Sequence, residues 1–137
     1  MNKAEFEQTI TNYRQGVGEI LPGYVAGRLA GPDALADELG LVLYSRDVLA
    51  RALAAADPLA AERLSEIERL DRELLALKDR LLLLAPFYAS LRIRKPRPRS
   101  QWWYYLDEIV SVPPPAAPGQ IPSGYWLPLT PQPAGRI

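Results

Sequence analysis

The sequence places five basic residues within eight positions and four consecutive aromatic residues shortly after them. The two groups are Arg92, Arg94, Lys95, Arg97 and Arg99, and then Trp102, Trp103, Tyr104 and Tyr105. Alternating prolines keep the basic stretch extended, because proline fixes its own φ and disfavours the α conformation in the preceding residue. Guanidinium groups attract carboxylates and phosphates, and aromatic rings anchor protein partners or stack on bases. This stretch therefore predicts a binding site for a protein or a nucleic acid.

Catalysis has little support in the same residues. The chain contains no histidine and no cysteine, so it lacks the usual general base, zinc ligand and thiolate nucleophile. Asp107 and Glu108 form an acidic pair beside the aromatic residues, but adjacent side chains point in different directions on a helix or a strand. Their expected role is to balance the nearby arginines. We therefore expect a non-enzymatic protein with no cofactor and no metal site.

A proline-rich tail follows the aromatic residues. Residues 113–133 contain eight prolines in twenty-one positions and no charged residue. This composition predicts an extended, polyproline-like segment without a packed core. Tyr125 and Trp126 are costly to leave in water, which indicates that they dock on a partner, on the chain's own helices or on a second subunit. Two PxxP spacings also occur, but they are common in any proline-rich segment.

The charge distribution separates the same region from the rest of the chain. Sixteen basic and sixteen acidic residues give no net charge, but residues 1–57 carry −3, residues 58–89 carry −1 and residues 90–137 carry +4. The acidic N-terminus is followed by no continuous apolar segment, and the longest apolar run is far shorter than a membrane span. We expect a cytoplasmic protein without a membrane partner.

Residues 1–89 are predicted to form a small helical domain, with residues 90–112 as the basic and aromatic segment and residues 113–137 as the tail. Phe6, Ile10, Tyr13 and Val17 recur three and four positions apart and predict a first helix that ends at Gly16 or Gly18. Glycines and prolines in residues 19–31 predict a turn-rich connection. The expected fold class is mainly α, with an extended C-terminal tail.

One long leucine-rich helix, at about residues 58–85, is expected to organise this domain. Its seam has strict three-four spacing and consists of Ile67, Leu70, Leu74, Leu77, Leu81 and Leu84. The pairs Arg69–Glu73 and Glu68–Arg72, each four residues apart, are expected to add support. The seam packs either on the other helices of the chain or on a second copy. Because the preceding helices are predicted to be short, we favour a homodimer.

Residues 33–56 contain a pattern of small and apolar residues around a glycine. A short helix is expected to end at Gly40, residues 41–44 are either a strand-like connection or more helix, and Ser45 is expected to cap the next helix, which stops near Asp57. The positions Ala36, Gly40 and Leu41 resemble the helix-turn-helix family of DNA-binding domains. Val48 departs from that pattern, because it follows the glycine by eight positions instead of about six. The resemblance implies base or phosphate contacts from Ser45, Arg46, Asp47 and Arg51.

The function that the sequence favours is protein binding by an adaptor, scaffold or assembly factor. The predicted partner-binding residues are Arg92, Arg94, Lys95, Arg97, Arg99, Trp102, Trp103, Tyr104, Tyr125 and Trp126. The alternative function is nucleic-acid binding, through Arg92–Tyr105 or through the degenerate helix-turn-helix. A structural interpretation competes with both, in which Trp102, Leu106 and Ile109 cover the leucine helix while the arginines stay hydrated.

Overall fold

The computed structural model describes residues 1–29, 31–84 and 88–109, and within these residues the chain is helical and has no strand. This confirms the mainly α prediction, while the predicted tail lies outside the described residues. The elements are α1 (Lys3–Gln15), the π-helix η1 (Gly16–Ile20), α2 (Leu21–Val25), α3 (Pro32–Ala54), α4 (Pro58–Glu62), α5 (Leu64–Leu84), α6 (Tyr88–Arg94) and the 3-10 turns η2 (Trp102–Tyr104) and η3 (Leu106–Glu108).

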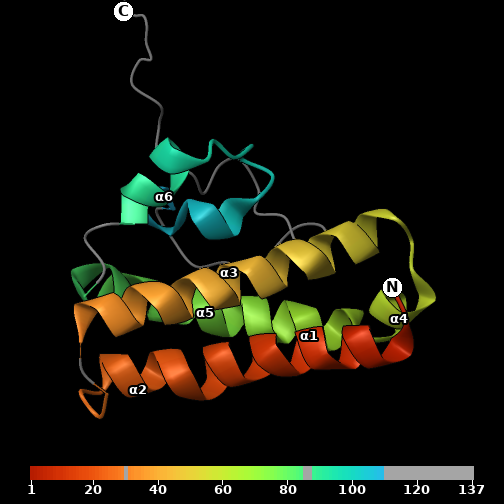
Figure 1. Ribbon diagram of the computed structural model, residues 1–137, viewed down its shortest axis with the longest axis horizontal. Coiled ribbons are helices and arrows are strands. Elements are labelled where there is room, and N and C mark those ends of the chain that lie inside the picture. The colour runs from red at the N-terminus through yellow and green to blue at the C-terminus, as the bar shows by residue number, and fades with distance from the viewer. Residues whose placement is uncertain (30, 85–87, 110–137) are drawn as a thin grey trace, which may run out of the picture.

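The long helices form an antiparallel bundle (Figure 1). The run from α1 to α2, then α3, then α5 lie side by side, and each reverses the direction of the one before. The segment from α6 to η3 lies along one side of this bundle, where η2 contacts α3 and η3 contacts α5. We call residues 88–109 the C-terminal segment. Its place on the bundle decides what the predicted site residues touch.

The first helical run is longer than predicted. Phe6, Ile10, Tyr13 and Val17 are buried as expected, and α1 ends at Gln15 with Gly16 as its C-cap, as predicted. The chain nevertheless stays helical through η1 and α2 to Val25, where a turn-rich connection was expected. A proline inside a regular α-helix clashes with the preceding turn. The wider π turn directly before Leu21, whose N–H donates to the Gly16 carbonyl, lets Pro22 follow within the helical run.

The predicted break at Gly40 is also absent, because α3 is one uninterrupted helix. A glycine costs only about 1 kcal/mol inside a helix, less than the burial of Leu39, Val42 and Leu43 on its inner face provides. The Ser45 hydroxyl donates to the Leu41 carbonyl instead of capping a new helix. A helix-turn-helix needs two helices joined by a turn, so the resemblance was wrong about the fold of this stretch.

The expected stop near residue 57 is confirmed. Helix α3 ends at Ala54, and the Asp57 carboxylate accepts a hydrogen bond from the Leu59 N–H at 2.9 Å, which caps α4. The leucine helix predicted at 58–85 is divided at Arg63 into α4 and α5. Helix α5 nevertheless carries the whole predicted seam.

The leucine seam lies mostly inside the single chain. Ile67, Leu70, Leu74 and Leu81 are at most 1% exposed, whereas Leu77 is half-buried and Leu84 is partly exposed. The other helices cover the seam because α1 to α2 and α3 are longer than the sequence pattern indicated. The four buried residues therefore have no surface left for a second copy, and the structure describes the intramolecular alternative.

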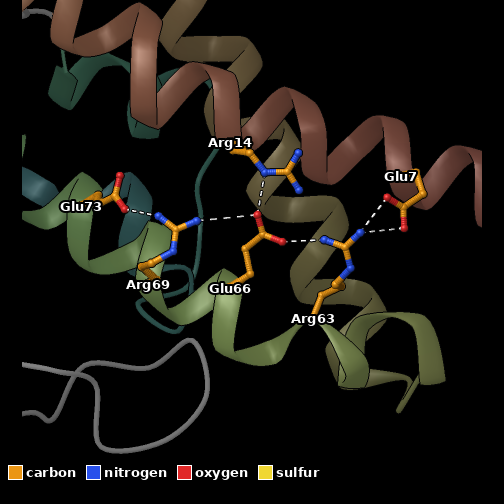
Figure 2. A network of polar contacts seen from close by, with 6 residues as sticks. All are labelled: Glu7, Arg14, Arg63, Glu66, Arg69 and Glu73. Atoms are coloured by element: carbon orange, nitrogen blue, oxygen red, sulfur yellow. Dashed lines mark hydrogen bonds and ion pairs between the residues drawn. The ribbon is translucent and has the colours of Figure 1, made fainter.

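Charged residues connect α1 with the start of α5 on the outside of the bundle (Figure 2). At the centre, Glu66 accepts hydrogen bonds from Arg14 Nε at 2.6 Å and from Arg63 Nη1 at 2.5 Å. The network also contains Glu7, Arg69 and Glu73, and the predicted Arg69–Glu73 pair is confirmed. The hydrogen bond from Arg14 is the main reason that the pKa of Glu66 is lowered. Exposed pairs of this kind add little stability, but they fix how α1 lies on α5.

The close approach of η1 to α3 predicts a strict size limit at Gly16. A methyl carbon added there would lie 2.3 Å from Val42 Cγ2, and a β-branched side chain has little freedom to turn away. We expect Gly16→Ala to lower the free energy of unfolding by about 1–3 kcal/mol in urea denaturation. Gly18→Ala is the matched control, because nothing lies within 4 Å of its added carbon. Equal stability of the two variants would contradict the close contact.

Candidate functional site

A buried ion pair joins the three long helices. Arg46 of α3 donates from Nε to Asp71 Oδ1 at 2.8 Å and from Nη2 to Asp71 Oδ2 at 2.9 Å. The Tyr13 hydroxyl of α1 donates to the same Oδ1 at 2.7 Å. The side chains of Arg46 and Asp71 are 1% and 0% exposed. One carboxylate of α5 therefore holds a group from each of the other two helices.

Burying these two charges costs free energy unless close polar contacts replace the water that they lose. Water cannot reach the charges, so the bidentate geometry and the tyrosine hydroxyl must replace their hydration. Burial has the largest single effect on Arg46 and lowers its pKa, but the charge of Asp71, the hydrogen bonds to Asp71 and the contacts with Tyr13 together outweigh burial, so the net pKa is raised. Burial, and then the charge of Asp71, raises the pKa of Tyr13 well above its ordinary value. The cluster is therefore a neutral pair with a protonated tyrosine.

The aromatic residues of η2 close this cluster from the side. The Arg46 guanidinium carbon lies 4.4 Å from the centre of the Trp103 ring and 5.8 Å from that of Trp102. The two indole rings meet edge to face, with centres 5.7 Å apart. Cation–π attraction strengthens when water is excluded, as it is here. The tryptophans thus act as the cover of the buried ion pair.

Asp47, the next residue of α3, anchors the C-terminal segment. Its Oδ1 accepts from Trp103 Nε1 at 2.7 Å, and its Oδ2 accepts from the Tyr104 hydroxyl at 2.6 Å and from Arg97 Nη1 at 2.9 Å. The Arg97 guanidinium also lies over the Tyr104 ring, 3.9 Å from its centre. Burial, and then the hydrogen bond to Asp47, raises the pKa of Tyr104. One carboxylate thereby binds three residues of the segment.

The rest of the segment is tied to itself. Arg92 donates to both carboxylate oxygens of Asp107, at 2.6 and 2.8 Å, and Arg99 pairs with Glu108 at 2.5 Å. The Tyr88 hydroxyl donates to the Trp103 carbonyl. The prediction that Asp107 and Glu108 balance the arginines is confirmed. The basic stretch and the acidic pair are thus two halves of one folded turn.

The structure places the predicted binding residues in two groups. Trp102, Trp103 and Tyr104 are at most 5% exposed, so their rings form part of the core in this conformation. Leu106 and Ile109 are also buried, and η3 contacts α5, as the competing structural interpretation predicted. Three arginines of the stretch are paired with carboxylates instead of hydrated: Arg92, Arg97 and Arg99.

The second group lies on the surface or outside the described residues. Arg94 and Lys95 are exposed, beside Ile93, which is 80% exposed. Tyr125 and Trp126 belong to the part of the tail that the structure does not describe. The structure therefore leaves Arg94 and Lys95 as the predicted basic residues that remain open to a partner.

The positions of Arg46 and Asp71 in the sequence are a signal for the buried cluster. Arg46 lies four residues after Val42 and three before Leu49, in the middle of the apolar face of α3. Asp71 lies next to Leu70 and one turn before Leu74 and Leu75. A charge at the centre of an apolar face needs an opposite charge to be buried. Two such charges on different helices indicate a pair.

This geometry supports anchoring of the C-terminal segment on the bundle. In the part of the chain that the structure describes, no group of acidic residues is arranged to hold a metal ion, and none of its helices is long and apolar enough to cross a membrane. No protein-family model matches the chain, and neither the curated proteins nor the solved structures contain a match. The function must therefore be argued from the geometry itself.

The buried tyrosines predict a steep loss of stability in alkali. The pKa values of Tyr13 and Tyr88 are raised, mainly by burial, so both groups keep their protons in the folded chain. Above about pH 10 the unfolded chain releases these protons and the folded chain does not. The contribution of these tyrosines to the free energy of unfolding should therefore be complete below about pH 10. Above that pH the free energy of unfolding should fall by about 1.4 kcal/mol per pH unit for each tyrosine.

Urea denaturation between pH 8 and pH 11 measures this slope. Tyr13→Phe should make it shallower by the contribution of one proton. Ile10→Val is the control, since it removes a buried methyl group on the same helix and should lower stability without changing the slope. An unchanged slope in Tyr13→Phe would contradict the role of that hydroxyl.

The contacts of Asp47 predict that its loss frees the C-terminal segment. Asp47→Ala leaves the Trp103 N–H and the Tyr104 hydroxyl without their acceptor, which should cost about 2–4 kcal/mol of unfolding free energy. Tryptophan emission should shift to the red as water reaches Trp102 and Trp103, measured in a Trp126→Phe background. Asp33→Ala is the matched control, because Asp33 is exposed on the same helix and forms no ion pair with a described residue. Native emission in Asp47→Ala would show that the segment is held by other contacts.

Proposed function

We propose that this protein is a non-enzymatic protein-binding module, in which the helical bundle is a platform that presents the C-terminal tail to a partner protein. The observation that carries the proposal is the attachment of the C-terminal segment by Asp47 and the buried ion pair. Ile109, the last described residue, is 3% exposed, so the chain leaves the bundle from a fixed position. A fixed starting point lowers the ordering cost of binding through an extended segment.

In this proposal the residues predicted for binding have three different roles. Trp102, Trp103 and Tyr104 hold the segment on the bundle. Arg94 and Lys95 are exposed and steer an acidic partner, with Ile93 beside them as an apolar contact. Tyr125 and Trp126 are the proposed anchors in the tail, because large aromatic residues are the commonest binding hot spots.

Nucleic-acid binding is the weaker proposal. Arg92, Arg97 and Arg99 already pair with Asp107, Glu108 and Asp47, so most of the basic stretch is neutralised within the chain. Affinity for phosphate grows with the number of cations that can release counterions. Arg94 and Lys95 alone provide a small site, and the helix-turn-helix route is closed by the unbroken α3.

Affinity capture from the native cell extract tests the proposal. Full-length protein should retain a protein that Tyr125→Ala/Trp126→Ala loses at least tenfold, because the substitutions remove both anchors. The matched control is Thr130→Ala in the same tail, which should retain the partner. Circular dichroism should show the same helical content in all three proteins.

The same samples are then treated with nuclease and with salt. Partner capture should survive nuclease and depend weakly on salt concentration. Capture of nucleic acid with a steep salt dependence, lost in Arg94→Ala/Lys95→Ala, would overturn the first proposal and establish the second. Equal capture by the wild type and the Tyr125→Ala/Trp126→Ala variant would exclude the tail as the binding element.

A further inference from the structure

Helix α3 presents an apolar stripe that no described residue covers. Leu41 is 62% exposed and Tyr44 is 58% exposed, although both are large apolar side chains. With the half-buried Val48 they recur at three and four positions, so they share one face of the helix. Apolar side chains that are grouped on one face indicate a contact with another molecule.

Opposite charges lie at the two ends of this stripe. Asp37 precedes Tyr44 by seven residues and Arg51 follows it by seven, which places each charge about 10 Å from Tyr44 along the axis. Both residues are exposed, and among the described residues neither forms an ion pair. The stripe of residues 37–51 is therefore acidic at one end, apolar in the middle and basic at the other.

This pattern is complementary to itself. When two identical helices meet antiparallel around a two-fold axis, a residue that precedes the axis faces the residue that follows it by the same number in the other copy. With the axis at Tyr44, Asp37 of each copy faces Arg51 of its partner, and the two Tyr44 side chains meet. Both ends of the contact then gain an ion pair.

Gly40 adds a second observation on the same face. A glycine is unfavourable inside a helix, and the fold of this chain does not require it, because a carbon added at Gly40 would have nothing within 4 Å. Gly16, where the added carbon would strike Val42, shows the opposite case. A glycine beside Leu41 and Tyr44 allows the backbone of a second helix to approach closely.

We propose that the stripe on α3 is a homodimer interface in which two copies of α3 pair antiparallel across Tyr44. We assign this surface to a second copy and not to the tail, because residues 110–135 carry no charge that could pair with Asp37 or Arg51. One helix face is smaller than the about 800 Å² per partner of a standard stable interface. The dimer should accordingly be weak, with a Kd of about 10 μM to 1 mM.

Exchanging the charges at positions 37 and 51 tests the antiparallel register of the two α3 helices. Self-association of the full-length protein is measured by sedimentation equilibrium. Asp37→Arg and Arg51→Asp should each weaken self-association at least tenfold, because each places like charges opposite one another. The double variant Asp37→Arg/Arg51→Asp should dimerise like the wild type. An equimolar mixture of the two single variants should form a heterodimer, since every facing pair is then attractive.

Two further variants separate this surface from others. Gly40→Gln should keep or increase the helical content and weaken the dimer at least tenfold, because the new side chain blocks the approach. Tyr125→Ala/Trp126→Ala should dimerise like the wild type, and loss of self-association there would assign it to the tail and overturn the proposal. A wild type that stays monomeric to about 1 mM, or single charge variants that do not associate when mixed, would also overturn it.

Discussion

The ion pair between Arg46 and Asp71 is the constraint on which the rest of the structure depends. Two charges without access to water are tolerated only when they pair closely, so the helices that carry them have one acceptable rotation and register. Of the Arg46 guanidinium nitrogens, only Nη1 lacks a hydrogen-bond partner within the described residues. Tyr13 extends the same requirement to α1. An apolar interior tolerates sliding of helices more readily than a bidentate pair does, because apolar contacts have no direction. The pair therefore specifies how α1, α3 and α5 meet.

The same pair explains why the aromatic residues are inside. A bundle of α1, α3 and α5 alone would leave one side of the guanidinium open to water, and the ring of Trp103 covers that side. Asp47, adjacent in sequence to Arg46, points to the segment and binds its polar groups. The C-terminal segment is thus an additional layer of the core, and not a flexible arm. Most of the positive charge of its basic residues is neutralised by ion pairs with carboxylates in the folded chain.

This cancellation changes how the function is understood. A stretch with five positive charges suggests an electrostatic binding site, but in the folded chain three of the five pair with carboxylates, two within the C-terminal segment and one on α3. Because the C-terminal segment is attached to the bundle, the tail starts from a fixed position. If two copies pair through the outer face of α3, next to Asp47, the dimer carries two tails. Linking two weak contacts raises the effective concentration of each. The proposed partner binding and the proposed dimer are separate surfaces of one platform.

The sequence by itself determined the helical class, the inward stripe of α1, the leucine face of α5 and the stop before Asp57, because these follow from local periodicity and local backbone preferences. It did not determine whether the chain stays helical at Pro22 and Gly40, since their local cost is outweighed by burial against residues far away in the chain. It also left open whether Trp102, Trp103 and Tyr104 form a binding surface or part of the core. Their burial depends on Arg46, Asp47 and Asp71, which come together only when the helices pack. The sequence places Arg46 and Asp71 on apolar helix faces, but it does not determine which aromatic side chains will cover their ion pair.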